Sequence, residues 1–184
     1  MTELSLNILD IAENSVRAGA KNIRIAVEED TAADTLTITV EDDGCGMNEE
    51  LLKSVQDPFT TTRTTRRVGL GIPLFQEAAQ ATGGYLTIQS EVGKGTRICA
   101  VFGLSHIDRM PLGDIASTIA TLIQCNSDRE WLYRYTVDGR SFTLDTREMR
   151  EMLGGVPLNE PDIVCWIREF VTQNTKEIDG GNSV

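Results

Sequence analysis

The chain has 184 residues, of which 40% are hydrophobic and 24% are charged, as in ordinary globular proteins of one or two domains. Its formal net charge of −11 disfavours nonspecific binding to nucleic acid, and no apolar run approaches the roughly 18 residues of a membrane span. The N-terminus lacks the charged start and apolar stretch of a signal peptide, so we expect a cytoplasmic protein that binds neither membranes nor nucleic acid.

The first expected helix covers residues 4–18 and carries a polar stripe. Asn7, Asp10, Asn14 and Arg17 are spaced so that they share one side of the helix, with apolar residues opposite. An ordinary amphipathic helix would turn this stripe toward water. The alternative is a ligand site, because an asparagine amide oxygen suits Mg²⁺ and a carboxylate one turn earlier could order or deprotonate a water.

The next elements carry two glycine motifs with a basic loop between them. Strands are expected at 22–29 and 35–41, and the second leads into the sequence DDGCG at residues 42–46. A helix at 48–55 and a loop at 57–68 follow, and then VGLGI at residues 68–72 begins a helix expected at 70–82. Backbone N–H groups at a helix start attract phosphate oxygens, which approach closely where no Cβ intervenes. Because the loop also holds three arginines within five residues, this region predicts a nucleotide-phosphate site.

Strands expected at 85–90 and 96–102 complete an antiparallel-rich sheet with helices on one face. Beyond residue 104 we expect a helix that begins at Pro111, a hairpin turning at Asp138-Gly139, and helices at 146–153 and 161–175. These last 75 or so residues either serve only for packing or bind a partner, and the residues alone favour neither.

Five motifs, in this order, resemble those of the GHKL ATPases, the Bergerat-fold superfamily of gyrase, the ninety-kilodalton heat-shock chaperone, histidine kinases and MutL. The segment DIAENSVRAGAKNIRI resembles the N box, DDGCGM the first glycine box, DPFTTTR the start of the lid, VGLGIP the second glycine box and GKGT the approach to the last strand. The resemblance implies an α+β, two-layer sandwich of the Bergerat type with a small C-terminal α/β extension. It divides the chain into an ATP-binding domain (1–103), a C-terminal region that is a possible partner-binding module (104–178) and a disordered tail (179–184).

The same resemblance implies the roles of individual residues, with ATP and Mg²⁺ as cofactors. Asn14 would coordinate the metal, Asp42 would accept the adenine amine, and Thr96 would touch the adenine side. A carboxylate cannot serve the carbonyl of guanine at that place, so ATP is expected over GTP. The full set of implied cofactor contacts is Asn14, Arg17, Asp42, Gly44, Gly46, Met47, Phe59, Thr60, Thr61, Arg63, Arg66, Arg67, Gly69, Leu70, Gly71 and Thr96.

Asp10 is the implied catalytic residue, and here the chain departs from the family pattern. Hydrolysing members have glutamate at this position as the general base, and aspartate shortens the reach by roughly an ångström. A second departure is Arg67, which stands where many relatives have glycine and could itself reach a phosphate. Kinase members of the family often lack a strong base, so the first departure favours phosphate transfer over hydrolysis.

Three functions therefore remain open. The first is a kinase-like enzyme that transfers phosphate from ATP to a separate protein. The second is a nucleotide-gated regulatory binding module with little or no hydrolysis, and the third is a weak ATPase that drives a dimer clamp, so a homodimer is possible. The only histidine, His106, follows the last strand of the ATP-binding domain, and no phosphoacceptor helix precedes the N box, so a self-contained histidine kinase is not expected.

Overall fold

The computed structural model describes residues 3–56 and 70–181. The described elements are α1 (Leu4–Arg17), β1 (Asn22–Asp30), β2 (Thr35–Asp42), α2 (Glu49–Gln56), α3 (Gly71–Ala81), β3 (Tyr85–Glu91), β4 (Gly95–Gly103), α4 (Ile115–Cys125), β5 (Glu130–Val137), β6 (Arg140–Asp145), α5 (Thr146–Leu153) and α6 (Pro161–Asp179).

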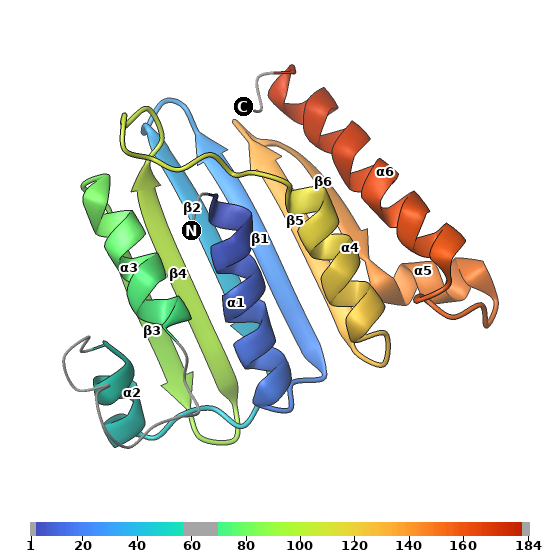
Figure 1. The fold of residues 1–184 in the computed structure, drawn as a ribbon, viewed down its shortest axis with the longest axis horizontal. Helices are drawn as coiled ribbons and strands as arrows, with labels where there is room; N and C mark the ends of the chain where they lie inside the picture. Colours follow the sequence, from blue (N-terminus) through green and yellow to red (C-terminus); the bar gives the residue numbers. More distant parts are fainter. Residues whose placement is uncertain (1–2, 57–69, 182–184) are drawn as a thin grey trace.

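Six strands form one mixed sheet in the order β3-β4-β2-β1-β5-β6. Neighbouring strands are antiparallel except β1 and β5, which run parallel. Helices α1, α3, α4 and α6 form a layer over one face of this sheet, with α1 between α3 and α4 (Figure 1). The predicted α+β, two-layer architecture is therefore confirmed.

The core lies between the helix layer and the sheet, and the strand sequences explain how. In β1, Ile23, Ile25 and Val27 alternate with exposed Arg24 and Glu28. Successive strand residues point to opposite faces, so this alternation turns one face of the sheet toward the helices. In α1, the apolar side formed by Leu4, Ile8 and Ile11 is fully buried against that face. Of the polar stripe of α1, Asp10 lies beside the start of α3, whereas Asn7 is buried.

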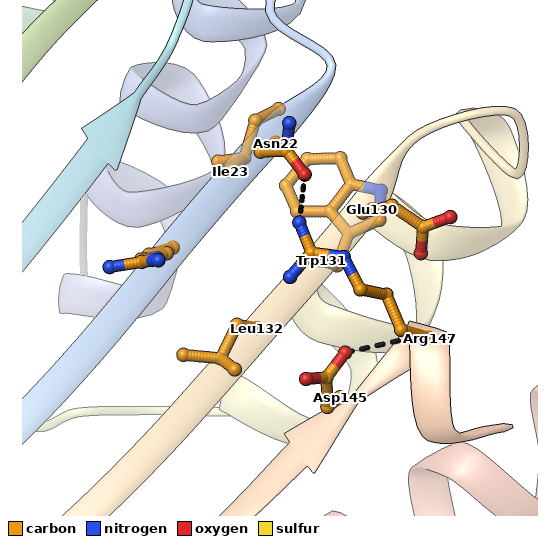
Figure 2. A pocket seen from close by; sticks show the side chains of 8 residues that line it. Asn22, Ile23, Glu130, Trp131, Leu132, Asp145 and Arg147 are labelled. Carbon is orange, nitrogen blue, oxygen red and sulfur yellow. Dashed lines mark hydrogen bonds between the residues drawn. The ribbon is translucent and has the colours of Figure 1, made fainter.

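The C-terminal part of the chain continues the same sheet. β5 pairs with β1 along its whole length, from Glu130 opposite Asn22 to Val137 opposite Glu29. At the start of this pairing, the guanidinium of Arg147, in the first turn of α5, donates a hydrogen bond to Asn22 Oδ1 (Figure 2). Residues from both parts of the chain therefore share one hydrogen-bonded sheet and one helix layer.

Two helices differ in extent from the sequence-based expectation. α4 begins at Ile115 rather than at Pro111, because the carbonyl groups of Pro111 and Leu112 accept hydrogen bonds from the N–H groups of Leu4 and Ser5 at the start of α1. α6 continues to Asp179, beyond the expected end at residue 175, and residues 182–184 of the expected tail lie outside the described residues.

Within the described ranges, no helix combines the length and apolarity needed to cross a bilayer.

Asp114 caps α4, which gives a pH-dependent prediction. Hydrogen bonds from the Ser117 side chain and N–H hold the pKa of the Asp114 carboxyl below its ordinary value of 3.8. A lowered folded-state pKa means that the cap stabilises the fold above that ordinary value and loses its effect as the pH falls through the folded-state pKa. Asp114→Ala should therefore lower the free energy of unfolding by about 1 kcal/mol at neutral pH.

Chemical denaturation of both proteins between neutral and strongly acidic pH measures this effect. The difference in the free energy of unfolding between the parent protein and Asp114→Ala should shrink as the Asp114 carboxyl becomes protonated. Asp128→Ala, which removes the same charge from the turn after α4, is the matched control. A difference that stays constant down to acidic pH would contradict the capping role.

Candidate functional site

A pocket of about 710 Å³ opens between the end of α1, the loop after β2, α2, the start of α3 and the start of β4. This volume lies within the range of about 300–1,000 Å³ that is typical of small-molecule sites. The pocket brings together six of the residues predicted from the sequence: Asn14, Arg17, Asp42, Gly46, Met47 and Thr96. The remaining lining residues were not predicted: Ile11, Ser15, Ala18, Cys45, Leu51, Ile72 and Ile98.

The carboxylate of Asp42 is held in a defined orientation in this pocket. Ser15 Oγ donates a hydrogen bond of 2.6 Å to Asp42 Oδ2, and the N–H of Gly44 donates one of 2.8 Å to Oδ1. Each carboxylate oxygen can accept a further hydrogen bond. An ionised carboxylate accepts but does not donate, so this group is suited to a ligand that presents an N–H or amine.

Ser15 is the most informative residue that sequence reasoning missed. It lies inside α1 directly after Asn14 and is only 3% exposed. A buried serine within a helix needs a hydrogen-bond partner, either a backbone carbonyl one turn earlier or a group on another element. That requirement is a usable sequence signal, but the identity of the partner, Asp42 on β2, depends on tertiary structure.

The Thr96 hydroxyl belongs to a small network on the strand side of the pocket. Ser90 Oγ accepts a hydrogen bond from the N–H of Met47 (2.8 Å), donates one to the carbonyl of Gly95 (3.0 Å) and lies 2.8 Å from Thr96 Oγ1. Because the single hydroxyl hydrogen of Ser90 is used toward Gly95, Thr96 is the donor in the third contact. Toward the pocket, Thr96 is therefore left as an acceptor. Ser90 was also not predicted.

Gly46 fixes the loop after β2 against the end of β3. Its φ of 67° lies in the left-handed region, and a Cβ at this position would lie 2.0 Å from the carbonyl oxygen of Glu91. Only glycine satisfies both conditions. Glycine at position 46 is therefore required by the close approach of two backbones, apart from any contact with a ligand.

Asn14 is the residue that best fits a metal ligand in this pocket. Its Oδ1 is a hard oxygen, which here accepts a 3.1 Å hydrogen bond from Arg17 Nη1, while Arg17 Nη2 pairs with Glu13. Within residues 3–56 and 70–181, no group of three or more acidic, histidine or cysteine residues is arranged so that it could hold a metal ion. This donor set suits Mg²⁺, which keeps most of its waters and needs few protein ligands when phosphates supply the others. Arg17 is largely exposed and would have to release Asn14 for the metal to bind.

Asp10 and the second glycine box meet at the junction of α1 and α3. Gly71 is the first residue of α3, and a Cβ there would lie 3.1 Å from Asp10 Cβ, so the two helices approach closely at this point. Asp10 is not among the pocket-lining residues, and Leu70 is 68% exposed. The other predicted phosphate contacts, namely Phe59, Thr60, Thr61, Arg63, Arg66, Arg67 and Gly69, lie outside the described residues.

The fold and the pocket together define an ATPase domain of the Bergerat type, with a helix layer on a mixed sheet and an acidic residue at the end of the second strand that bonds to the N-terminal helix. The sequence profile of the histidine kinase-, DNA gyrase B- and HSP90-like ATPase family matches residues 2–106. The chain therefore belongs to this family.

Curated relatives with similar sequences include sensor kinases. The chain is 36% identical over 108 residues to the sensor protein kinase FleS of Pseudomonas aeruginosa, with 59% of this chain and 26% of that protein aligned. It is 32% identical over 103 residues to a putative sensor protein of Shewanella frigidimarina, with 55% of this chain and 16% of that protein aligned. The similarity thus spans about a quarter or less of these two relatives.

Solved structures share the fold at low sequence identity. The N-terminal domain of a DNA repair protein superposes with a TM-score of 0.55 at 15% identity, covering 79% of this chain and 53% of that one. The MutL ATPase domain of Aquifex aeolicus, solved in complex with ADP, superposes with a TM-score of 0.50 at 14% identity, covering 84% and 70%. These likenesses confirm the predicted Bergerat-type fold.

Proposed function

We propose that this chain binds ATP with Mg²⁺ and transfers the γ-phosphate to a separate protein. The observation that carries the proposal is the Asp42 carboxylate, which Ser15 and Gly44 orient within a pocket of about 710 Å³ beside Asn14. The family contains ATPases and kinases, and one structural neighbour was solved with ADP. Asp42 would accept the adenine amine, and Asn14 would hold the metal that neutralises part of the phosphate charge.

In this reaction the bond between the γ-phosphorus and the β,γ-bridging oxygen breaks, and ADP leaves. A nucleophilic side chain of the partner protein forms the new bond to phosphorus and gives up its proton. Arg63, Arg66 and Arg67 would stabilise the charge on the transferred group, and Asp10 would orient the acceptor. Asp10 is shorter than the glutamate of hydrolysing relatives and packs beside Gly71, so water should be a poor competitor.

A second candidate is a nucleotide-gated binding module with little or no phosphate transfer. The observation that favours it is the shared sheet: β5 of the C-terminal region pairs with β1, β6 pairs with β5, and β2 and β4 of the same sheet contribute residues to the pocket. In this case residues 104–178 would be a partner-binding surface whose affinity depends on the bound nucleotide. A weak ATPase acting as a dimer clamp is less favoured, because Asp10 is shorter than the glutamate that serves as the general base in hydrolysing relatives.

Incubation with γ-labelled ATP, Mg²⁺ and cell extract distinguishes these functions. We expect label to appear on a partner protein, little free phosphate, and a much weaker labelled band with Asp42→Asn. Nucleotide binding without any labelled partner would favour the binding module. Rapid release of phosphate that Asp10→Ala abolishes would instead indicate an ATPase and contradict the proposal.

A further inference from the structure

Asp43, the residue after Asp42, accepts hydrogen bonds from residues at and just before the start of β1. Asp43 Oδ1 accepts hydrogen bonds from the N–H groups of Lys21 (2.7 Å) and Asn22 (2.9 Å), and its Oδ2 accepts one from Asn22 Nδ2 (2.7 Å). Burial raises the pKa of the Asp43 carboxyl, but the hydrogen bonds from Asn22 and Lys21 outweigh it and hold the pKa below its ordinary value. The ionised carboxylate thus fastens the turn after β2 to the start of β1.

The Asn22 amide also binds a residue from the C-terminal region. Its Oδ1 accepts a hydrogen bond from Arg147 Nη2, while the backbone N–H of Arg147 donates a 2.9 Å bond to Asp145 Oδ1, the cap of α5 (Figure 2). Figure 2 shows the Arg147 side chain, just after the end of β6, reaching across to Asn22 at the start of β1. The side-chain amide of Asn22 therefore connects Asp43, the residue after Asp42, to the first turn of α5.

We infer that Asn22 and Arg147 are positioning residues for adenine recognition, acting through Asp43 on the carboxylate of Asp42. This inference rests on the proposed ATP site. Asp42 and Asp43 are consecutive, and the N–H of Asp43 also bonds to the carbonyl of Asn22 at 3.3 Å, so the orientation of Asp42 depends on how firmly this turn is held. A hydrogen bond to the amine is sensitive to small displacements of its acceptor.

The turn has other supports, which limits the size of the effect. The N–H of Cys45 bonds to the carbonyl of Ala18, and Ser15 holds Asp42 itself. Arg147 is exposed, so removing its side chain leaves the core intact. Loss of the Arg147 contact should therefore weaken, but not abolish, the discrimination of adenine.

The test compares ATP with purine riboside 5′-triphosphate, which lacks the exocyclic amine, by calorimetric titration of the full chain in the presence of Mg²⁺. Arg147→Ala should weaken ATP binding by about three- to tenfold, the equivalent of one hydrogen bond, and change binding of the amine-free nucleotide by less than about twofold. Asn22→Ala should have at least the same effect, and the double variant should be no weaker than Asn22→Ala alone, because the two residues act in series. Arg147→Lys should restore part of the loss.

Arg134→Ala is the matched control, since it removes an exposed arginine from β5 that bonds to Ser141 rather than to β1. It should leave both nucleotides unaffected. The inference is wrong if Arg147→Ala weakens binding of both nucleotides equally, or weakens binding of neither. In both cases the proposed ATP site is unaffected, provided that the parent protein binds ATP. If the parent protein itself does not prefer ATP over the amine-free nucleotide, the assigned role of Asp42 is wrong, and the inference is overturned with it.

Discussion

Replacing Asp42 with asparagine is expected to weaken ATP binding by about 1.5–3 kcal/mol, which is roughly 10- to 150-fold in the dissociation constant. Asparagine keeps the shape of the side chain but loses the charge, and only one of its terminal atoms is an acceptor. The N–H of Gly44 can only donate, so it will retain the amide oxygen, while the Ser15 hydroxyl can rotate to accept from the amide nitrogen. The fold should therefore survive while the acceptor for the adenine amine is weakened.

Calorimetric titration of ATP at saturating Mg²⁺ measures this effect, with thermal unfolding as a check on folding. Glu41→Gln is a matched control, because it removes the same charge from the preceding residue of β2, which does not line the pocket. It should bind ATP as the parent protein does. Undiminished ATP affinity in Asp42→Asn would show that the adenine lies elsewhere.

Asn14→Ala is expected to remove the dependence of nucleotide binding on magnesium. In the parent protein, Mg²⁺ should tighten ATP binding by roughly tenfold or more, since an interaction with a charged group contributes about 1.5–3 kcal/mol. The variant should bind ATP with the same weak affinity in Mg²⁺ and in chelator. The physical reason is that Asn14 Oδ1 is the hard oxygen of the pocket wall on α1, where the metal would lie between protein and phosphates.

Asn14→Asp supplies the comparison for this prediction. A carboxylate at the same place keeps a hard oxygen ligand, so the response to Mg²⁺ should persist, and the affinity for the metal can even rise. ATP titrations with Mg²⁺ and with chelator, performed on all three proteins, give the answer. A magnesium response in Asn14→Ala equal to that of the parent protein would exclude Asn14 as a ligand.

Periodicity was sufficient to predict most helices and strands, because α1 and β1 each alternate apolar and polar residues with the period of their own structure. The start of α4 was predicted four residues too early, because Pro111 and Leu112 have backbone carbonyls that bond to α1, a contact that local sequence does not reveal. The parallel pairing of β5 with β1 was likewise not predictable. The alternation of Trp131, Tyr133 and Tyr135 indicates a strand with one buried face, but not which neighbour it pairs with.

The candidate site was likewise predicted only in part from the sequence. Asn14, Asp42 and Thr96 were found through motifs, and they do line one pocket. Ser15 and Ser90 act by orienting Asp42 and Thr96, and their partners lie on other elements. Such supporting contacts arise when distant segments pack together, so no spacing within the sequence identifies them.

The parallel pairing of β5 with β1 has a practical consequence for anyone who wants to isolate the nucleotide-binding portion. A fragment cut near residue 106, where the family profile ends, would leave the hydrogen-bonding edge of β1 bare and strip α4 from the flank of α1. Bare strand edges recruit other chains, so such a fragment would be prone to self-association. In this protein the strands of both regions belong to one hydrogen-bonded sheet, so biochemical work should begin from all 184 residues.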